Sequence, residues 1–283
     1  MKYNNITPIN VSWMITNRCN YNCQFCFRPT GKELILSQAK LIIDKLADSG
    51  LKKISWAGGE PLLWSNIIDL IEYTHLKKIV TMLITNGSLI TDKILDRLQP
   101  CLDWLNLPLE GTTNEMNERM TRRSGHYSKV MDILKKLKNS NISLKINTVV
   151  SRINADDIYN MLDIIKAYNI KRWKLFQFYP VRGISTVSKE KFEISDMEFK
   201  RIRENITKLI NGSNCDIIFE NNNELENSYF SITPDGEAYT SINGRDYFFG
   251  NLLNQSITEI WNNNLLDKKK YWARANWVFN NSE

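Results

Sequence analysis

Short runs of β-branched and aromatic residues alternate with longer segments of helical periodicity over the first two-thirds of the chain. The short runs predict strands near residues 11–16, 53–57, 79–85, 104–109, 142–150 and 172–178. The longer segments predict helices near residues 37–49, 65–75, 91–98, 127–139 and 155–168, with N-caps at Ser37, Ser65, Thr91 and Asn154. This alternation predicts repeated βα units and a parallel sheet.

Six βα units are too few to close an eight-stranded barrel. The expected fold is therefore α/β, a partial (β/α)6 TIM-like barrel whose active face lies at the carboxyl ends of the strands. After about residue 190 the pattern changes to a helix near 195–211, strands near 216–220 and 228–233, a Pro-Asp-Gly turn at 234–236 and a helix near 257–265. We interpret residues 1–190 as the barrel and residues 191–283 as a C-terminal extension that closes over the active site. The Asn-rich stretches at 221–223 and 262–264 predict loops.

Composition narrows the class of protein. The chain has 283 residues, of which 42% are hydrophobic, enough for a packed core. Lys and Arg exceed Asp and Glu by 6 without a dense basic run, which favours an anionic small molecule over a nucleic-acid groove, although an ordinary solvated surface explains the surplus equally well. The N-terminus lacks the features of a signal peptide, and no stretch reaches the ~18 apolar residues of a membrane span. We expect a cytoplasmic protein, monomeric and without a membrane or nucleic-acid partner.

Three of the five cysteines follow the first predicted strand in a C-x3-C-x2-C pattern: Cys19, Cys23 and Cys26. Soft thiolates favour zinc or an iron–sulfur cluster. A structural zinc site needs a fourth ligand, and neither His75 nor His126 stands in the usual close pairing with a second ligand. Three cysteines leave one iron of a [4Fe–4S] cluster open to a substrate or cofactor. Cys101 and Cys215 stand alone, and we interpret them as ordinary thiols.

The second and third predicted strands end in polar, glycine-containing segments, WAGGEP at 56–61 and TNGS at 85–88. Gly58 and Gly59 let the backbone approach a ligand closely, and Glu60 can accept a hydrogen bond from an ammonium group. The Asn86 amide suits ribose hydroxyls. Each segment alone is typical of a turn, but their order at successive strand ends indicates a binding site.

With the cysteine triplet followed by GGE, the sequence resembles the radical S-adenosylmethionine (SAM) superfamily. The resemblance implies that SAM chelates the open iron of the cluster. One-electron reduction by an external donor, such as flavodoxin or ferredoxin, then gives a 5′-deoxyadenosyl radical that abstracts hydrogen from a substrate. It further implies that Gly58, Gly59 and Glu60 contact the SAM methionine and Asn86 the ribose. Glu110, which directly follows the fourth predicted strand, is assigned to the same cofactor.

Two late strands carry cations on one face. Lys145 and Asn147 share a face of the fifth predicted strand, and Arg172 and Lys174 share a face of the sixth, because side chains alternate along a strand. Their neighbours on the opposite faces are apolar: Leu144, Ile146, Trp173 and Leu175. Three cations inside a barrel need an anion such as a triphosphate to offset repulsion and desolvation. The alternative is that one or both are edge strands with a solvated polar face.

The chain also resembles the viperin family of antiviral radical SAM nucleotide dehydratases. The matching segments are CNYNCQFCF at 19–27, GGEP at 58–61, TNGSLI at 85–90, KINTVVSRIN at 145–154, RWKLFQ at 172–177 and NSYF at 227–230. The resemblance implies a lyase that converts a CTP-like ribonucleoside triphosphate into its 3′-deoxy-3′,4′-didehydro analogue, in antiviral defence. It assigns Lys145, Arg172 and Lys174 to the phosphates, Asn147 to the base or sugar, Tyr229 to the base, and His126 to the nucleotide.

Two other functions remain open at this point. The tail GNLLNQSITEIWNNN resembles the extensions of peptide-modifying radical SAM enzymes, but those extensions usually bind further clusters through several cysteines and here only Cys215 follows Cys101. A non-catalytic iron–sulfur or zinc module that binds RNA or senses redox state is the third possibility. Such a module would have little use for the GGEP and TNGS segments.

Overall fold

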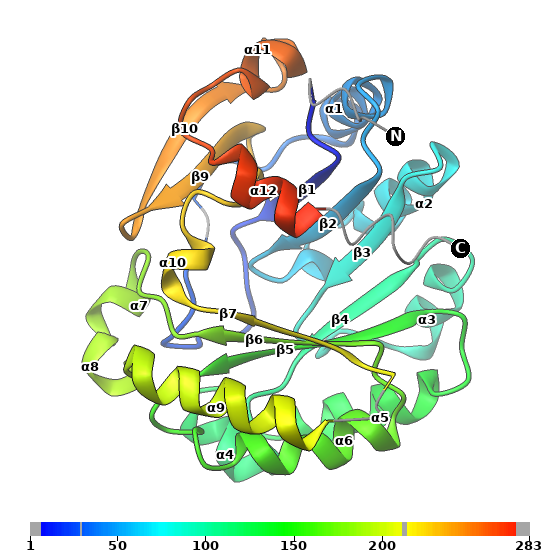
Figure 1. Cartoon of the computed structure of the whole chain (residues 1–283). Helices are drawn as coiled ribbons and strands as arrows, with labels where there is room; N and C mark the ends of the chain where they lie inside the picture. Colours follow the sequence, from blue (N-terminus) through cyan, green and yellow to red (C-terminus); the bar gives the residue numbers. More distant parts are fainter. Residues whose placement is uncertain (1–6, 29, 211–213, 276–283) are drawn as a thin grey trace.

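The computed structural model describes residues 7–28, 30–210 and 214–275. One ten-stranded sheet runs through these residues in the order β10-β9-β8-β1-β2-β3-β4-β5-β6-β7 (Figure 1). Its parallel run comprises β1 (Asn10–Thr16), β2 (Lys53–Gly58), β3 (Val80–Ile84), β4 (Trp104–Pro108), β5 (Ser143–Val150), β6 (Arg172–Gln177) and β7 (Asp216–Glu220). On the other side of β1 the run continues into β8 (Ser231–Ile232), which pairs in parallel with β1. Beyond β8 lie β9 (Glu237–Ile242) and β10 (Arg245–Asn251), which are antiparallel to their neighbours.

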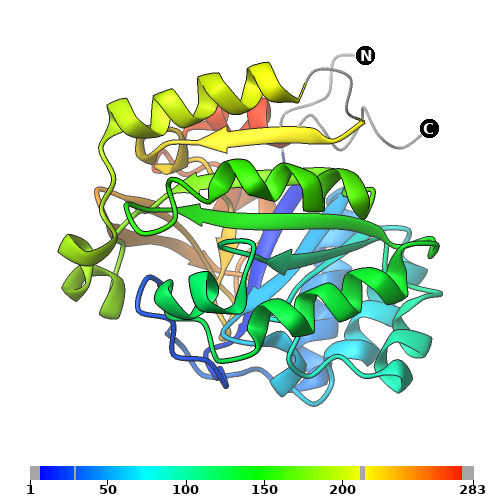
Figure 2. The ribbon, with the colours of Figure 1, turned by 90° about the horizontal axis from the view of Figure 1, so that it is seen from below.

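The helices that connect the parallel strands cover the outer side of the sheet: α1 (Leu36–Asp48), α2 (Ile67–Leu76), α3 (Asp92–Leu98), α5 (His126–Leu137), α6 (Met161–Ala167) and α9 (Asp196–Leu209). Figure 2 shows α9, α6 and α5 lying along the strands. The apolar faces of β5 and β6 pack into this layer, as the alternation predicts, with Ile146, Trp173 and Leu175 fully buried. The polar faces of these strands therefore point to the inside of the arc.

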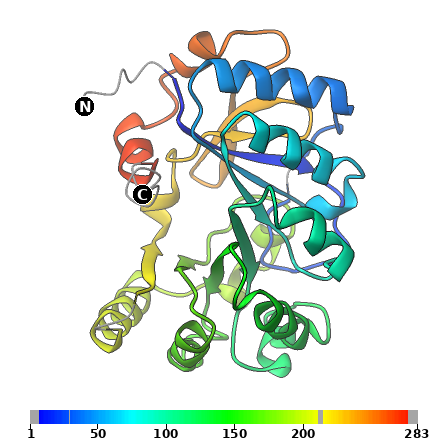
Figure 3. The same ribbon diagram turned by 90° about the vertical axis from the view of Figure 1, so that its right-hand side faces the viewer.

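Short elements fill the connections: η1 (Pro61–Leu63), α4 (Asn114–Arg119), η2 (Ile158–Asn160), α7 (Ile184–Val187), α8 (Lys189–Phe192), α10 (Asn222–Leu225), α11 (Ile257–Trp261) and α12 (Lys268–Ala275). Helix α12 lies between β1 and β7 (Figure 3). The Tyr271 hydroxyl accepts from Ile9 N and Asn10 N at 2.9 and 2.8 Å, and Arg274 binds Glu220 of β7. This helix bridges the open side of the arc. In the part of the chain that the structure describes, no helix has the length and apolar character needed to cross a membrane.

The predicted fold class is confirmed, and the parallel run extends two strands beyond the predicted six, to β7 at one end and β8 at the other. Residues 216–220, expected in the extension, form β7 and pair in parallel with β6. Both β5 and β6 lie inside the sheet, which rules out the edge-strand alternative for the cationic faces. Residues beyond 190 continue the sheet at both ends of the run, and the boundary at residue 190 stays a prediction.

Three of the four predicted N-caps are wrong. Thr91 caps α3 by accepting from Ile94 N, as expected, but α1 begins before Ser37 and α2 begins at Ile67, after a turn that contains Ser65. The Asn154 side chain accepts from Ser151 N at 2.8 Å and donates to Glu110 O at 2.8 Å. It ties the ends of two strands together, and the helical segment begins only after it.

The C-terminal third also differs from the expected pattern. The Pro-Asp-Gly turn joins β8 to β9, and residues 262–264 lie outside regular structure, as predicted. The stretch 221–223 was expected as a loop, yet Asn221 accepts from Glu224 N at 2.9 Å and caps α10. The predicted strand at 228–233 is confined to 231–232, and the predicted final helix ends at Trp261. The hairpin β9-β10 and helix α12 were not predicted.

Candidate active site

The end of β2 packs directly against the start of the cysteine-containing segment. Gly59 N donates to Thr16 O at 2.7 Å, and Glu60 N donates to Arg18 O at 2.7 Å. A Cβ on Gly59 would lie 2.1 Å from Arg18 O, and one on Gly58, at φ +142°, would lie 2.4 Å from Thr16 O. Both glycines are therefore required for this backbone contact. The contact fixes where residues 17–26, which carry the three cysteines and which we call the cysteine loop, leave β1. Their contact with SAM stays a prediction.

Glu60 and Asn86 connect three strand ends. The buried Glu60 carboxylate accepts from Leu62 N at 3.1 Å, Thr85 Oγ1 at 2.7 Å and Asn86 N at 2.7 Å. Burial raises the pKa of Glu60, and these hydrogen bonds lower it. Asn86 Nδ2 donates to Asn20 Oδ1 at 2.9 Å and so reaches the cysteine loop. The two residues lie together at the expected end of the sheet, and both organise the loop.

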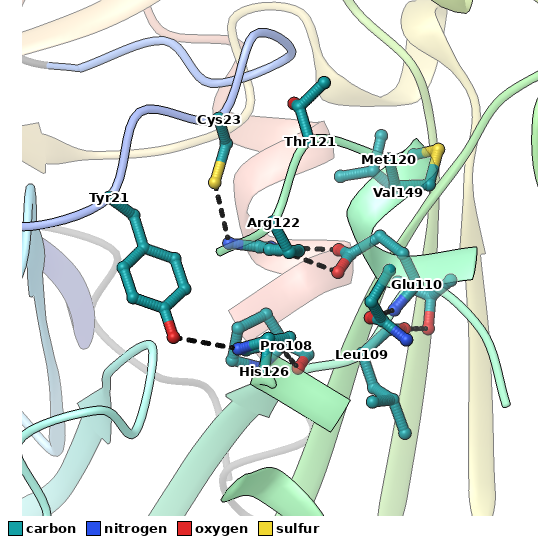
Figure 4. Close-up of polar contacts among 12 residues, drawn as sticks. Tyr21, Cys23, Pro108, Leu109, Glu110, Met120, Thr121, Arg122, His126 and Val149 are labelled. Atoms are coloured by element: carbon teal, nitrogen blue, oxygen red, sulfur yellow. Dashed lines mark hydrogen bonds and ion pairs between the residues drawn. The ribbon is translucent and has the colours of Figure 1, made fainter. Parts of the chain in front are cut away.

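A second segment, residues 121–126, holds the cysteine loop from the other side. Gln24 N donates to Thr121 Oγ1 at 2.8 Å, and Arg122 Nη1 lies 3.4 Å from Cys23 Sγ (Figure 4). The Tyr21 hydroxyl lies 3.4 Å from Nδ1 of His126. We call residues 121–126 the loop clamp. Its three contacts fall on consecutive parts of the cysteine loop.

The loop clamp is anchored to the end of β4 by a buried ion pair. Arg122 Nε and Nη2 donate to the Glu110 carboxylate at 2.8 and 2.9 Å, and Glu110 is fully buried (Figure 4). The Arg122 guanidinium also lies over the Phe25 ring, 4.8 Å from its centroid. Sequence reasoning missed Arg122. The signal was available, because a carboxylate at the end of a buried strand needs a cationic partner. Any contact of Glu110 with SAM stays a prediction.

His126 is buried at the start of α5. Its Nε2 lies 3.0 Å from Pro108 O. Burial, together with the nearby Arg122 charge, lowers the pKa of His126 to about 3, so the imidazole is neutral at neutral pH. Its polar contacts are with Pro108 and with Tyr21 of the cysteine loop (Figure 4). Contact with a nucleotide stays a prediction.

The donor set of the cysteine loop suits an iron–sulfur cluster. All three thiols fall in one loop at the carboxyl end of β1, and burial raises the pKa of Cys23 and raises that of Cys26 to about 11. A bound metal would supply the positive charge that thiolates need here. Within residues 7–28, 30–210 and 214–275, no three His, Cys, Asp or Glu side chains converge on a point that could hold a single metal ion. A cluster places its thiolate ligands on different irons and does not require such convergence.

The cationic faces of β5 and β6 lie side by side. Lys145 is in register with Arg172, and Asn147 with Lys174, and the exposed fractions of the three cations are 8%, 3% and 7%. Lys53 of β2 is also buried and lies close enough to these cations to feel their charge. Burial and the charges of Lys145, Arg172 and Lys174 lower the pKa of Lys53 well below its ordinary value. Lys53, Lys145, Arg172 and Lys174 form what we call the cation cluster. Sequence reasoning treated Lys53 only as the first residue of a strand.

Two carboxylates of β7 partly neutralise the cation cluster. Arg172 pairs with Asp216, and Lys174 Nζ lies 2.5 Å from Glu220 Oε1. Arg274 of α12 also pairs with Glu220, and its guanidinium lies 3.9 Å from the Tyr229 ring centroid. The Tyr229 hydroxyl donates to Glu220 at 2.6 Å and accepts from Lys174 at 2.7 Å. The structure therefore places Tyr229 beside Lys174, one of the predicted phosphate-binding residues. Glu220 and Arg274, which were not predicted, lie at the same place.

Lys145 has neither a hydrogen bond nor an ion pair with any described residue, although it is buried. Burial, Lys174 and Arg172 hold the pKa of Lys145 well below its ordinary value. The side-chain oxygen of Asn147 is likewise buried without a partner among the described residues. Such groups are costly to bury, and a polyanionic ligand with hydroxyl groups would satisfy both.

Comparisons with known proteins agree with this chemistry. The model of the radical SAM superfamily matches residues 13–165. A protein of Flammeovirga pacifica, named S-adenosylmethionine-dependent nucleotide dehydratase, is 30% identical over 90% of this chain and 89% of its own length. The nucleotide dehydratase RSAD2 of Siniperca chuatsi is 30% identical over 81% of this chain and 67% of its own length.

Solved structures support the fold at lower identity. Streptococcus suis SuiB bound to S-adenosylmethionine has a TM-score of 0.74 and 18% identity, over 95% of this chain and 68% of SuiB. The enzyme anSMEcpe, with bound AdoMet and a peptide, has a TM-score of 0.73 and 17% identity, over 93% of this chain and 84% of that protein. By its sequence matches, the chain belongs to the radical SAM superfamily, which implies a [4Fe–4S] cluster and SAM as cofactors, and within it to the S-adenosylmethionine-dependent nucleotide dehydratase family.

Proposed function

We propose that this chain is a dehydratase that uses SAM and acts on a ribonucleoside triphosphate. The observation that carries the proposal is the cation cluster inside the barrel. Within the cluster and beside it, Arg172 pairs with Asp216, Lys174 and Arg274 share Glu220, and Lys145 has no partner among the described residues. Uncompensated buried cations are destabilising, so their presence is best explained by a polyanionic ligand. A triphosphate has the required charge and only accepts hydrogen bonds.

One half of the site would bind the cofactors and the other half the substrate. The cysteine loop would hold the cluster through Cys19, Cys23 and Cys26, and the segments around Gly59, Glu60 and Asn86 would hold SAM. When bound, these cofactors supply a radical that abstracts hydrogen from the ribose. The residues of the cation cluster would bind the phosphates and fix the ribose in one orientation, while α12 covers the open side of the barrel and limits access of water.

Several finer features belong to the same proposal. The preferred substrate is CTP-like. After hydrogen abstraction from C4′ of the ribose, the 3′-hydroxyl takes up a proton and leaves as water, and one-electron reduction gives the 3′-deoxy-3′,4′-didehydro analogue. Asn147 and Tyr229 contact the sugar or base. An external donor such as flavodoxin or ferredoxin supplies electrons to a monomeric, cytoplasmic enzyme that serves antiviral defence. The names of the relatives at 30% identity support the reaction class, whereas the structural similarity to peptide-binding enzymes at 17–18% identity concerns the fold alone.

An anaerobic screen of the four ribonucleoside triphosphates tests the proposal. The reconstituted protein is incubated with SAM, a reductant and each nucleotide, and 5′-deoxyadenosine release is measured. We expect one triphosphate to stimulate release far more than its own nucleoside, because the phosphates dominate recognition. Equal stimulation by nucleoside and triphosphate, or stimulation by none of the four, would contradict the proposal and direct the search to peptide substrates.

A further inference from the structure

Asn106 is a buried polar residue without a hydrogen-bond partner. It lies on β4, is fully buried, and neither Oδ1 nor Nδ2 of its side chain has a partner among the described residues. Its chain neighbours Leu105 and Leu107 pack in the hydrophobic core on the outer side of the sheet. An amide that loses both its donor and acceptor contacts with water destabilises the folded chain. Its retention calls for a ligand that restores these contacts.

The register places Asn106 beside the cation cluster. In the sheet it is paired with Lys145 of β5, which is paired in turn with Arg172 of β6. Side chains in register on neighbouring parallel strands point to the same side of the sheet. Asn106, Lys145 and Arg172 therefore form one row across three strands inside the barrel. The first two members of the row have no hydrogen bond to any residue in the described ranges.

We propose that Asn106 is a phosphate-binding residue of the substrate site, and that its Nδ2 donates to a phosphate oxygen held by Lys145 and Arg172. The inference rests on the proposed function. An ionised phosphate oxygen only accepts hydrogen bonds, so it suits the amide donor. The amide carbonyl can accept from the Lys145 ammonium. An asparagine here adds a hydrogen bond without adding a further positive charge to a row in which Lys145 and Arg172 already repel each other.

Two substitutions separate this role from a structural one. Asn106→Asp keeps the size of the side chain but replaces the donor with a second acceptor, and it gives Lys145 an ionic partner. Asn106→Leu removes both polar atoms. Without nucleotide, we expect Asn106→Asp to raise the Tm, since an orphan amide is replaced by an ion pair. The matched control is Asn141→Asp, which makes the same change at an exposed position.

The binding experiment uses calorimetry on the anaerobic, cluster-loaded protein, with CTP, inorganic tripolyphosphate and cytidine as probes. We expect both Asn106 variants to weaken CTP and tripolyphosphate at least tenfold, to leave cytidine and SAM within twofold, and the control to leave all four unchanged. If the Asn106 variants bind tripolyphosphate within twofold of the parent, the inference is overturned. The same holds if only cytidine binding is weakened. If Lys145→Met weakens binding and the Asn106 variants do not, the inference alone fails. If the parent binds neither CTP nor tripolyphosphate, the proposed function fails.

Discussion

The loop clamp and the cation cluster both contain buried polar groups, but these groups are satisfied in different ways. In the loop clamp, Arg122 is held by Glu110, and His126 lies between Pro108 and Tyr21. In the cation cluster, Lys145 lacks a hydrogen-bond partner among the described residues, and so does Asn106 beside it. The difference indicates two kinds of role. A network in which every buried polar group has a hydrogen-bond partner maintains the local geometry, whereas a network with unpaired groups is completed by a ligand.

The contrast also predicts how each region responds to substitution. Removal of one charge from the ion pair that anchors the loop clamp leaves the other charge buried without a partner, so the folded state loses stability. Removal of Lys145, which has no ion pair among the described residues, relieves repulsion within the cation cluster, so stability is kept and ligand affinity is lost. The four predictions that follow test this comparison, and they are ordered from the largest expected effect to the smallest.

The largest effect is expected from loss of any of the three loop cysteines. Cys19→Ala, Cys23→Ala or Cys26→Ala should abolish the brown cluster and SAM cleavage, because each removes one of three thiolates. Iron and sulfide analysis after anaerobic reconstitution measures this. Cys101→Ser and Cys215→Ser serve as controls and should retain the cluster. Full cluster content in a variant of the triplet would refute the ligand assignment.

The loop clamp should be sensitive to the loss of one charge. Arg122→Met leaves the Glu110 carboxylate buried without a partner, and we expect the free energy of unfolding to fall by about 3–5 kcal/mol. Urea unfolding followed by circular dichroism measures it. Arg97→Met removes an exposed ion pair with Asp69 and should cost about 1 kcal/mol or less. Similar losses for the two variants would show that the buried pair does not anchor the loop.

The cation cluster should respond in the opposite way. Lys145→Met should weaken triphosphate binding by about 2–5 kcal/mol while SAM binding stays nearly unchanged. The Tm of the nucleotide-free protein should stay the same or rise, since a buried charge without an ionic partner among the described residues is removed. Calorimetric titration and thermal unfolding measure the two quantities. A fall in Tm with unchanged nucleotide affinity would mean that Lys145 has a structural role.

The smallest effect is a pH dependence from His126. Its pKa is about 3 in the folded state and near the ordinary 6.5 in the unfolded chain, so the unfolded state binds a proton first as the pH falls. The associated stability is present above pH 6.5 and is lost toward pH 3, with a slope of up to about 1.4 kcal/mol per pH unit. Urea unfolding at pH 7.5 and pH 5 is compared between the parent and His126→Phe. Equal pH dependence in both would exclude His126 as the source.

The sequence by itself determined the βα alternation, the parallel sheet and the cysteine loop. These features depend on local patterns: alternating apolar positions, glycines at strand ends and closely spaced thiols. It also identified Lys145, Arg172 and Lys174, because side-chain alternation along a strand fixes which residues share a face. It missed β9, β10 and α12, whose short segments mix polar and aromatic residues without a clear period and gain order from packing against the rest of the sheet.

Only the tertiary structure decided which distant residues meet. Arg122 reaches Cys23 across 99 positions of the chain, and Arg274 reaches Glu220 across 54. In the sequence, Asn106 is a single polar residue within an apolar strand. Only the sheet register places it beside Lys145. A sequence specifies which face a side chain occupies, but strand order and register are set by packing of the whole barrel. The partners of buried charges follow from that order.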